Sequence, residues 1–128
     1  MKETLERIVP EAADQRQIAG EDTFQLHLAR YQFAARFAAG RVLDIACGVG
    51  YGSALLADLP AAEHVTGVDL AEEALALARE RYGRAKVSFV QADCMTYREE
   101  GVRTVVSLET VEHLPDPAGF IRAMAGQL

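Results

Sequence analysis

The sequence predicts an α/β fold in which helices flank a parallel β-sheet. From residue 41 onward, short apolar runs alternate with segments of helical periodicity, as in βαβ units. The first apolar run ends in a glycine-rich turn with Gly48, Gly50 and Gly52, and the next two runs end at Asp69 and Asp93. Because ligands of parallel sheets bind beyond the carboxyl ends of the strands, this pattern also predicts a binding site there.

The binding domain is predicted to span residues 22–128, after a polar segment of mixed charge at residues 1–21. It begins with a helix from Asp22 or Thr23 to about Ala39, which Gly40 ends. Apolar residues at helical spacing predict a stripe along this helix, formed by Leu26, Ala29, Phe33 and Phe37.

Four strands and three further helices are predicted after this first helix. The strands lie at 41–46, 65–68, 87–90 and 104–108, and the helices lie at 53–59, at 72–82 and from residue 116 onward. Glu72 and Glu73 favour a helix start because carboxylates stabilise the amino end of the helix dipole. Asp116 is suited to cap the last helix, with Pro117 at its first position.

Size and charge restrict the classes of function. The chain has 128 residues and a mass of 13.9 kDa, which allows one domain. Its net charge of −6 disfavours a nucleic-acid partner, since a negative protein is not attracted to phosphates. The uncharged runs are too short to span a bilayer, and the sequence begins without the apolar core of a secretory signal. Two cysteines are too few for a disulfide scaffold, so a cytoplasmic location is expected.

The glycine turn and the acidic strand ends are compatible with two kinds of adenosine cofactor. Asp69 follows Gly50 by 19 residues, the spacing at which a carboxylate binds ribose hydroxyls in nicotinamide and flavin dinucleotide sites and in S-adenosylmethionine sites. A dinucleotide fingerprint would require Gly or Ala where this chain has Ser53. Asp44, just before the turn, would repel a pyrophosphate and favour a ligand with an ammonium group. Asp93 suits a hydrogen bond from an adenine amino group.

At these segments the chain resembles class I S-adenosylmethionine-dependent methyltransferases. VLDIACGVGYGSALLA resembles their motif I, VTGVDLAEEALALARERY the ribose segment, VSFVQADCM the adenine segment, and VVSLETVEHLPDP the fourth-strand motif. The resemblance covers roughly residues 22–128. It implies a Rossmann-like fold and suggests that the chain holds the amino-terminal, cofactor-binding portion, with the first four of the family's seven strands.

The resemblance also implies the roles of individual residues. Asp44, Gly48 and Gly50 would hold the methionine part of S-adenosylmethionine, Asp69 the ribose, and Asp93 the adenine. Ala46 stands where the usual acidic-x-G-x-G-x-G pattern has its first glycine. The full set of predicted cofactor contacts is Asp44, Ala46, Gly48, Gly50, Tyr51, Asp69, Leu70, Asp93, Cys94 and Glu109.

The string Glu109-x-x-Glu112-His113 supplies the candidate catalytic residues. His113 is the candidate general base, with Glu109 or Glu112 as alternatives. The same string resembles the metal site of small-RNA 2′-O-methyltransferases and of some ubiquinone-pathway O-methyltransferases. The favoured interpretation is that it caps the next helix or lines the pocket without a metal, since no further ligand follows downstream.

The predicted activity is methyl transfer to a small molecule, at an oxygen or carbon nucleophile. The fourth-strand motif lacks the Asn/Asp-Pro-Pro-aromatic signature of enzymes that methylate amino groups of nucleic acids. The alternative is a module or truncated fragment that binds S-adenosylmethionine or S-adenosylhomocysteine without transferring a methyl group. A dinucleotide oxidoreductase is a distant third. The valine-rich fourth strand would form an exposed sheet edge, which predicts a homodimer or a swapped dimer.

Overall fold

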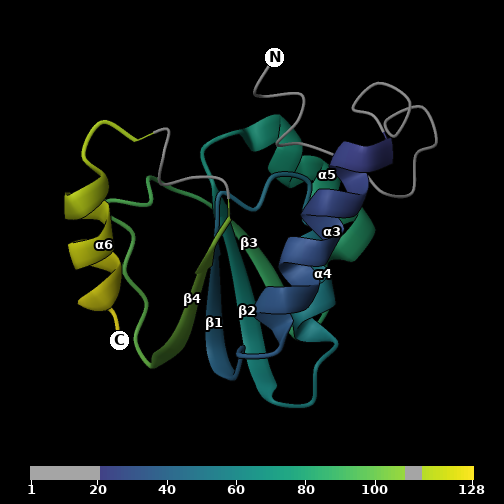
Figure 1. The fold of residues 1–128 in the computed structure, drawn as a ribbon, viewed down its shortest axis with the longest axis horizontal. Helices are drawn as coiled ribbons and strands as arrows, with labels where there is room; N and C mark the ends of the chain where they lie inside the picture. The colour runs from purple at the N-terminus through teal and green to yellow at the C-terminus, as the bar shows by residue number, and fades with distance from the viewer. Residues whose placement is uncertain (1–20, 109–113) are drawn as a thin grey trace.

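The computed structural model describes residues 21–108 and 114–128, and its described strands form one parallel sheet. The strand order is β3-β2-β1-β4. Helices α3, α4 and α5 lie on one face of the sheet and α6 lies on the other (Figure 1). The predicted fold class is thus confirmed. The predicted polar segment at residues 1–21 falls outside the described residues, apart from Glu21.

The observed elements follow the predicted order. They are α3 (Glu21–Ala35), β1 (Gly40–Ile45), α4 (Tyr51–Ala57), β2 (Ala62–Asp69), α5 (Glu72–Tyr82), β3 (Val87–Gln91), β4 (Val102–Ser107) and α6 (Pro117–Ala125). Helix α5 has the predicted bounds. The Asp116 side chain caps α6 by accepting a hydrogen bond from the Gly119 amide at 3.0 Å, as predicted. Among the described residues, no helix combines the length and apolar character needed to cross a membrane.

Strand β1 lies between β2 and β4, and this position buries it on both faces. On the α3–α5 face, Val42 packs with Leu56 of α4 and Val65 of β2. On the α6 face, Leu43 and Ile45 pack with a cluster that includes Phe120 of α6. Because successive strand residues point to opposite faces, Asp44 shares the face of Val42 and is fully buried beneath the helices.

The predicted stripe on the first helix does not face the core. Phe33 is 58% exposed and Phe37, beyond the helix end, is 65% exposed; Leu26 is also exposed. Tyr31 is buried instead, against α4, because Gly52 leaves room there for its ring. The helix also ends at Ala35, four residues before the predicted end. Gly40, with a φ of 69°, begins β1 and does not end the helix.

Candidate functional site

The glycine turn connects the end of β1 to the start of α4 through left-handed backbone. Gly48 has a φ of 58° and Gly50, the N-cap of α4, has a φ of 92°. A Cβ on Gly50 would approach the side chains of Ala78 and Phe89 to 2.8 Å, so glycine is needed for space as well as conformation. Ala46 is also left-handed, with a φ of 59°, the only non-glycine residue with positive φ in the described chain.

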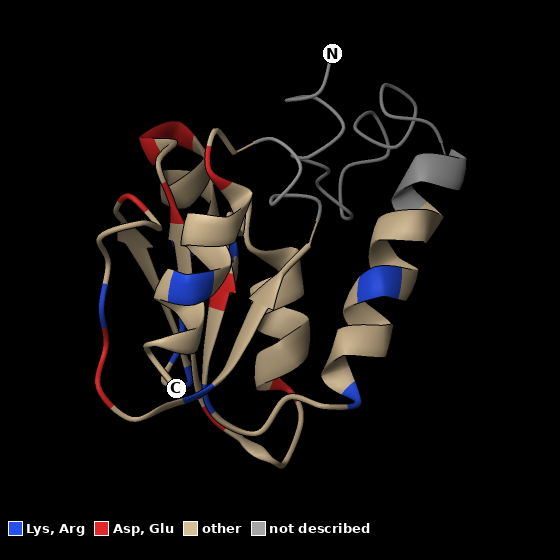
Figure 2. Cartoon of the chain, turned by 60° about the vertical axis from the view of Figure 1, so that its left-hand side comes forward, with Lys and Arg blue, Asp and Glu red and all other residues tan. Residues whose placement is uncertain are grey.

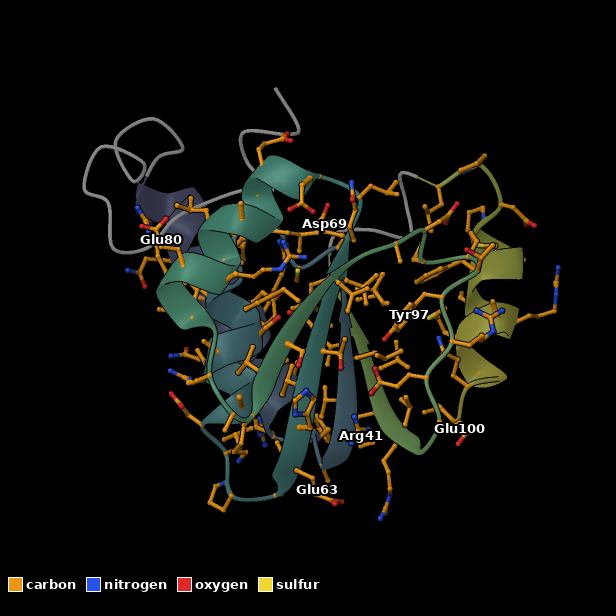
Figure 3. All side chains as sticks on the ribbon, turned by 180° about the vertical axis from the view of Figure 1, so that it is seen from behind. Arg41, Glu63, Asp69, Glu80, Tyr97 and Glu100 are labelled. Atoms are coloured by element: carbon orange, nitrogen blue, oxygen red, sulfur yellow. The ribbon has the colours of Figure 1, made fainter. Side chains whose placement is uncertain are left out.

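Asp69 lies at the carboxyl end of β2, where Figure 3 shows it at the upper end of the sheet, opposite Arg41 and Glu63. Its Oδ2 accepts a hydrogen bond from the Gly48 amide at 2.8 Å, and its Oδ1 accepts one from the Ala71 amide at 3.0 Å. The carboxylate therefore joins the glycine turn to the start of α5. Since an ionised carboxylate has about four acceptor positions, it can accept further donors.

A cavity of about 130 Å³ opens at the carboxyl ends of β1, β2 and β3. Four predicted cofactor contacts line it, which are Ala46, Asp69, Leu70 and Cys94. Its remaining walls are Ile45, Val68, Ala92 and Leu114. Apart from Asp69, every lining side chain is apolar or a thiol. The cavity thus combines flat apolar walls with one carboxylate, as a binding site for a nucleoside requires.

Asp44 does not line this cavity, because its carboxylate is enclosed between the sheet and the helices. The Tyr31 hydroxyl donates to both carboxylate oxygens at 3.1 Å, and the Ser53 hydroxyl donates to Oδ2 at 2.7 Å. Burial, and to a smaller extent the charge of Asp69, raises the pKa of Asp44 to about 7, although the hydrogen bonds from the two hydroxyls favour the ionised form.

Asp93 and the two cysteines occupy different environments. The exposed Asp93 side chain accepts from the Met95 amide at 2.8 Å and thereby closes the turn after β3. Burial, and then the charge of Asp93, raises the pKa of the Cys94 thiol. Burial and the charge of Asp44 raise the pKa of Cys47. Both thiols are therefore poor nucleophiles at neutral pH.

The other predicted contacts lie around the turn. Tyr51 is the first residue of α4, and its ring meets the ring of Tyr31 edge-on with centroids 5.5 Å apart. Leu70 is 67% exposed at the mouth of the cavity. Figure 2 shows acidic residues at the upper end of the molecule, where the strands end, and others in its middle and lower parts, among the basic residues in view.

Glu109, Glu112 and His113 lie outside the described residues, so their roles stay predictions. The described residues on either side of this segment line two different surfaces. Leu114 lines the cavity beside Asp69, and Leu108 lines a separate groove between α3 and β4. Within the described ranges, no three His, Cys, Asp or Glu side chains gather in a way that could hold a metal ion.

The sequence did not predict that Tyr31 and Ser53 would contact Asp44 beneath the glycine turn. Both donate hydrogen bonds to Asp44. Ser53 was considered only as a departure from the dinucleotide fingerprint, although a hydroxyl in the first turn after a glycine loop can reach back to the preceding strand. No signal identifies Tyr31 as a partner of Asp44, because 13 residues separate them.

Comparison with known proteins identifies the family. A model of the methyltransferase domain matches residues 42–128, which include most of β1, the glycine turn and Asp69. The chain belongs to the S-adenosylmethionine-dependent methyltransferase family. The predicted family is thereby confirmed, and S-adenosylmethionine is the cofactor of this family, as the sequence predicts.

Two curated relatives show the extent of the match. A "probable S-adenosylmethionine-dependent methyltransferase" of Mycolicibacterium smegmatis is 35% identical over 119 residues, covering 92% of this methyltransferase chain and 44% of the relative. A ubiquinone biosynthesis O-methyltransferase of Aromatoleum aromaticum is 38% identical over 96 residues, covering 71% of this chain and 40% of the relative. The chain therefore spans about two fifths of the length of these relatives.

Solved methyltransferase structures share the fold. The structure described as a complex of DhpI with SAM and HEP superimposes with a TM-score of 0.65 at 28% identity, covering 88% of this chain and 56% of that one. The four-stranded parallel sheet is thus part of the Rossmann-like fold of the family.

Proposed function

We propose that this chain binds S-adenosylmethionine at the carboxyl ends of β1, β2 and β3 and supports methyl transfer to a small molecule. The observation that carries the proposal is the place of Asp69. Its carboxylate lies at the rim of an apolar cavity and contacts the glycine turn through the Gly48 amide. A charged acceptor beside an apolar wall fits an adenosine, whose ribose presents two hydroxyls next to a flat base.

The residues of the cavity fit the parts of this cofactor. We assign Asp69 to the ribose hydroxyls, and Leu70 and Cys94 to the faces of the adenine. Asp93, in the turn beside Cys94, is assigned to the adenine amino group. Gly48 and Gly50, whose left-handed backbone shapes the turn, are assigned to the methionine part. When bound, S-adenosylmethionine supplies an electrophilic methyl group on a sulfonium.

The chain's own contribution to transfer is alignment and, for a hydroxyl acceptor, removal of a proton. We propose His113 as the base, with Glu109 or Glu112 as alternatives, because in the sequence these residues directly precede Leu114, which lines the cavity. We also propose Glu109 as a cofactor contact near the sulfonium, since a carboxylate there would stabilise positive charge.

We propose a small-molecule acceptor that is methylated at oxygen or carbon. The net charge of −6 disfavours nucleic acid, and the matched relatives include enzymes named as ubiquinone biosynthesis O-methyltransferases. An assay of methyl transfer to hydroxylated aromatic compounds tests this class. Transfer to RNA or DNA in the same assay, with none to small molecules, would contradict it.

Calorimetry with S-adenosylhomocysteine tests the cofactor assignment. The Asp69→Asn variant should bind about 10- to 100-fold more weakly than the wild type, because a charged acceptor of two hydroxyls becomes neutral. Asp58→Asn is the matched control, since Asp58 forms an exposed ion pair with Arg84 away from the cavity. Equal affinities of all three proteins would refute the assignment of Asp69, and no binding to folded wild type would refute the cofactor.

A module that binds the cofactor without transferring its methyl group is the second candidate. It concerns these 128 residues, which span about two fifths of the length of the curated relatives. This candidate predicts binding of S-adenosylmethionine with no turnover for any acceptor. Methyl transfer by the purified 128-residue chain would exclude it, whereas tight binding of NAD in place of S-adenosylmethionine would favour the oxidoreductase alternative.

We also propose that the chain forms a homodimer through β4. Among the described strands β4 pairs only with β1, so its other edge is open. A groove of about 280 Å³ runs beside it, lined by Phe33 and Phe37 on one side and by the second half of β4 on the other. Sedimentation should show a dimer at micromolar concentration. The Phe37→Ser variant should weaken association, and Ile121→Ser, which alters an exposed residue of α6, should not. A wild-type monomer would contradict the proposal.

Two further proposals concern the whole chain. The cofactor domain is proposed to begin near residue 22, so a variant that starts at residue 22 should bind S-adenosylhomocysteine with the affinity of the full chain. A cytoplasmic location is proposed from the two thiols, Cys47 and Cys94, which form no disulfide. Cell fractionation checks it, and recovery of the protein outside the cytoplasm would contradict it.

A further inference from the structure

The side chain of Tyr31 makes three contacts that join α3 to the glycine turn. Its hydroxyl donates to both oxygens of Asp44 at 3.1 Å. Its ring fills the space where a Cβ on Gly52 would lie, so any larger residue at 52 would collide with it. The edge of the ring also meets Tyr51, with centroids 5.5 Å apart.

The partners of Tyr31 lie on both sides of the turn. Asp44 is in β1, two residues before Ala46, whereas Gly52 and Ser53 are in the first turn of α4. Since Ser53 donates to the same carboxylate at 2.7 Å, Asp44 is a bridge between strand, helix α4 and helix α3. The ends of the turn are therefore held at a fixed separation by hydrogen bonds that converge on one buried group.

We propose that Tyr31 is a positioning residue for the cofactor site, which holds the glycine turn in its receiving shape through Asp44 and Gly52. The inference rests on the proposed binding of S-adenosylmethionine. Tyr31 itself lies behind the turn and is not among the residues that line the cavity. Its effect on the cofactor is therefore indirect, through the position of the backbone at Gly48 and Gly50.

The groups around Asp44 explain why the Tyr31 hydroxyl matters. The titratable groups that face Asp44 are Tyr31 from α3, Tyr51 from α4, Cys47 from the turn and Asp69 from the end of β2. Each of these is neutral or negative at neutral pH. The ionised form of Asp44 thus depends on two neutral hydroxyl donors, those of Tyr31 and Ser53. Removing one of them favours the protonated carboxyl and weakens the bridge.

The test is the Tyr31→Phe variant, which keeps the ring against Gly52 and removes the hydroxyl. Affinity for S-adenosylhomocysteine is measured by calorimetry from pH 6 to pH 9. We expect binding about fivefold weaker than wild type at pH 7 and close to wild type at pH 9, where Asp44 ionises without the donor. Tyr82→Phe is the matched control, because the Tyr82 hydroxyl has no hydrogen-bond partner within the described structure.

A second measurement needs no ligand and separates this inference from the proposed function. The amide resonances of Gly48 and Gly50 are followed by NMR through the same pH range. Their pH midpoint should move upward by about one unit in Tyr31→Phe and stay unchanged in Tyr82→Phe. Failure of the wild type to bind S-adenosylhomocysteine would overturn the proposed function, whereas an unchanged midpoint in Tyr31→Phe would overturn the role of Tyr31.

Two other outcomes are informative. If Tyr31→Phe weakened binding equally at every pH, with an unchanged midpoint, the hydroxyl would have only a structural role and the inference would be wrong. If Tyr31→Phe did not fold, Gly52→Ala would replace it in both measurements, because the added Cβ displaces the ring and keeps the hydroxyl. The same upward shift of the midpoint is expected there, and its absence would overturn the inference.

Discussion

Ala46 has a left-handed backbone at the position where the glycine pattern of the family has its first glycine. For a residue with a Cβ this conformation costs about 1–2 kcal/mol, whereas glycine adopts it freely. We expect Ala46→Gly to raise the free energy of unfolding by about 0.5–1 kcal/mol, after the extra chain entropy of glycine is subtracted. Urea unfolding measures the change.

Ala76→Gly is the control for this prediction, because Ala76 lies exposed within α5. There the same substitution should lower the free energy of unfolding by about 1 kcal/mol, since glycine disfavours a helix interior. A loss of stability at both positions would show that the left-handed backbone of Ala46 imposes no strain.

Asp44 should make stability depend on pH. Its pKa is raised to about 7 in the folded state from an ordinary value of 3.8. Between pH 4 and pH 7 the folded state therefore holds a proton that the unfolded state has lost. The free energy of unfolding then falls as the pH rises, by at most about 1.4 kcal/mol per pH unit. Asp44→Asn should flatten this slope in urea unfolding from pH 4.5 to 7.5.

The control for the pH prediction is Asp58→Asn, which changes an exposed carboxylate in an ion pair with Arg84. It should retain the wild-type slope. A slope in Asp44→Asn as steep as that of the wild type would mean that another group titrates in this range.

At the residue scale, sequence predicted the groups that local spacing determines. The glycines of the turn and Asp69 follow from their positions at strand ends, and the structure brings Asp69 to the cavity with Ala46, Leu70 and Cys94. The enclosure of Asp44 could not be predicted, because it depends on a tyrosine from a helix whose packing angle is a tertiary property.

The contact between α3 and α4 depends on the absence of a side chain at Gly52. We expect Gly52→Ala to lower the free energy of unfolding by about 1–3 kcal/mol, because the methyl group would force the Tyr31 ring away from α4. Gly126→Ala is the control, since Gly126 has an ordinary φ of −66° and only ordinary contacts near a new Cβ. Thermal unfolding compares the two, and a loss in Gly126→Ala as large as that in Gly52→Ala would contradict the prediction.

The elements differed in how well sequence predicted them. The bounds of α5 were correct because acidic residues mark its start and Gly83 follows its end. The prediction for α3 was wrong about which face is buried. An aromatic stripe and an alanine-rich face both recur with the helical period, so spacing alone does not distinguish them. In the structure, Tyr31 and the small residues after it pack against α4, whereas Phe33 and Phe37 line the groove beside β4.

At the scale of the whole molecule, the sheet has a protected centre and two less protected edges. Strand β1 is paired on both sides, whereas β3 and β4 each have one partner in the described sheet. In hydrogen exchange at concentrations below dimer formation, we expect the amides of β1 and β2 to exchange most slowly and those of β4 faster. Exchange in β4 as slow as in β1 under those conditions would contradict this order.

The two amide hydrogen bonds of Asp69 have a consequence for the thermodynamics of ligand capture. A free aspartate samples several rotamers, and restricting it on binding costs conformational entropy. Here the Gly48 and Ala71 amides fix the carboxylate before any ligand arrives. The entropy of the Asp69 side chain is therefore lost during folding and not on binding. A ligand that donates to Asp69 should bind more tightly than it would bind a mobile carboxylate.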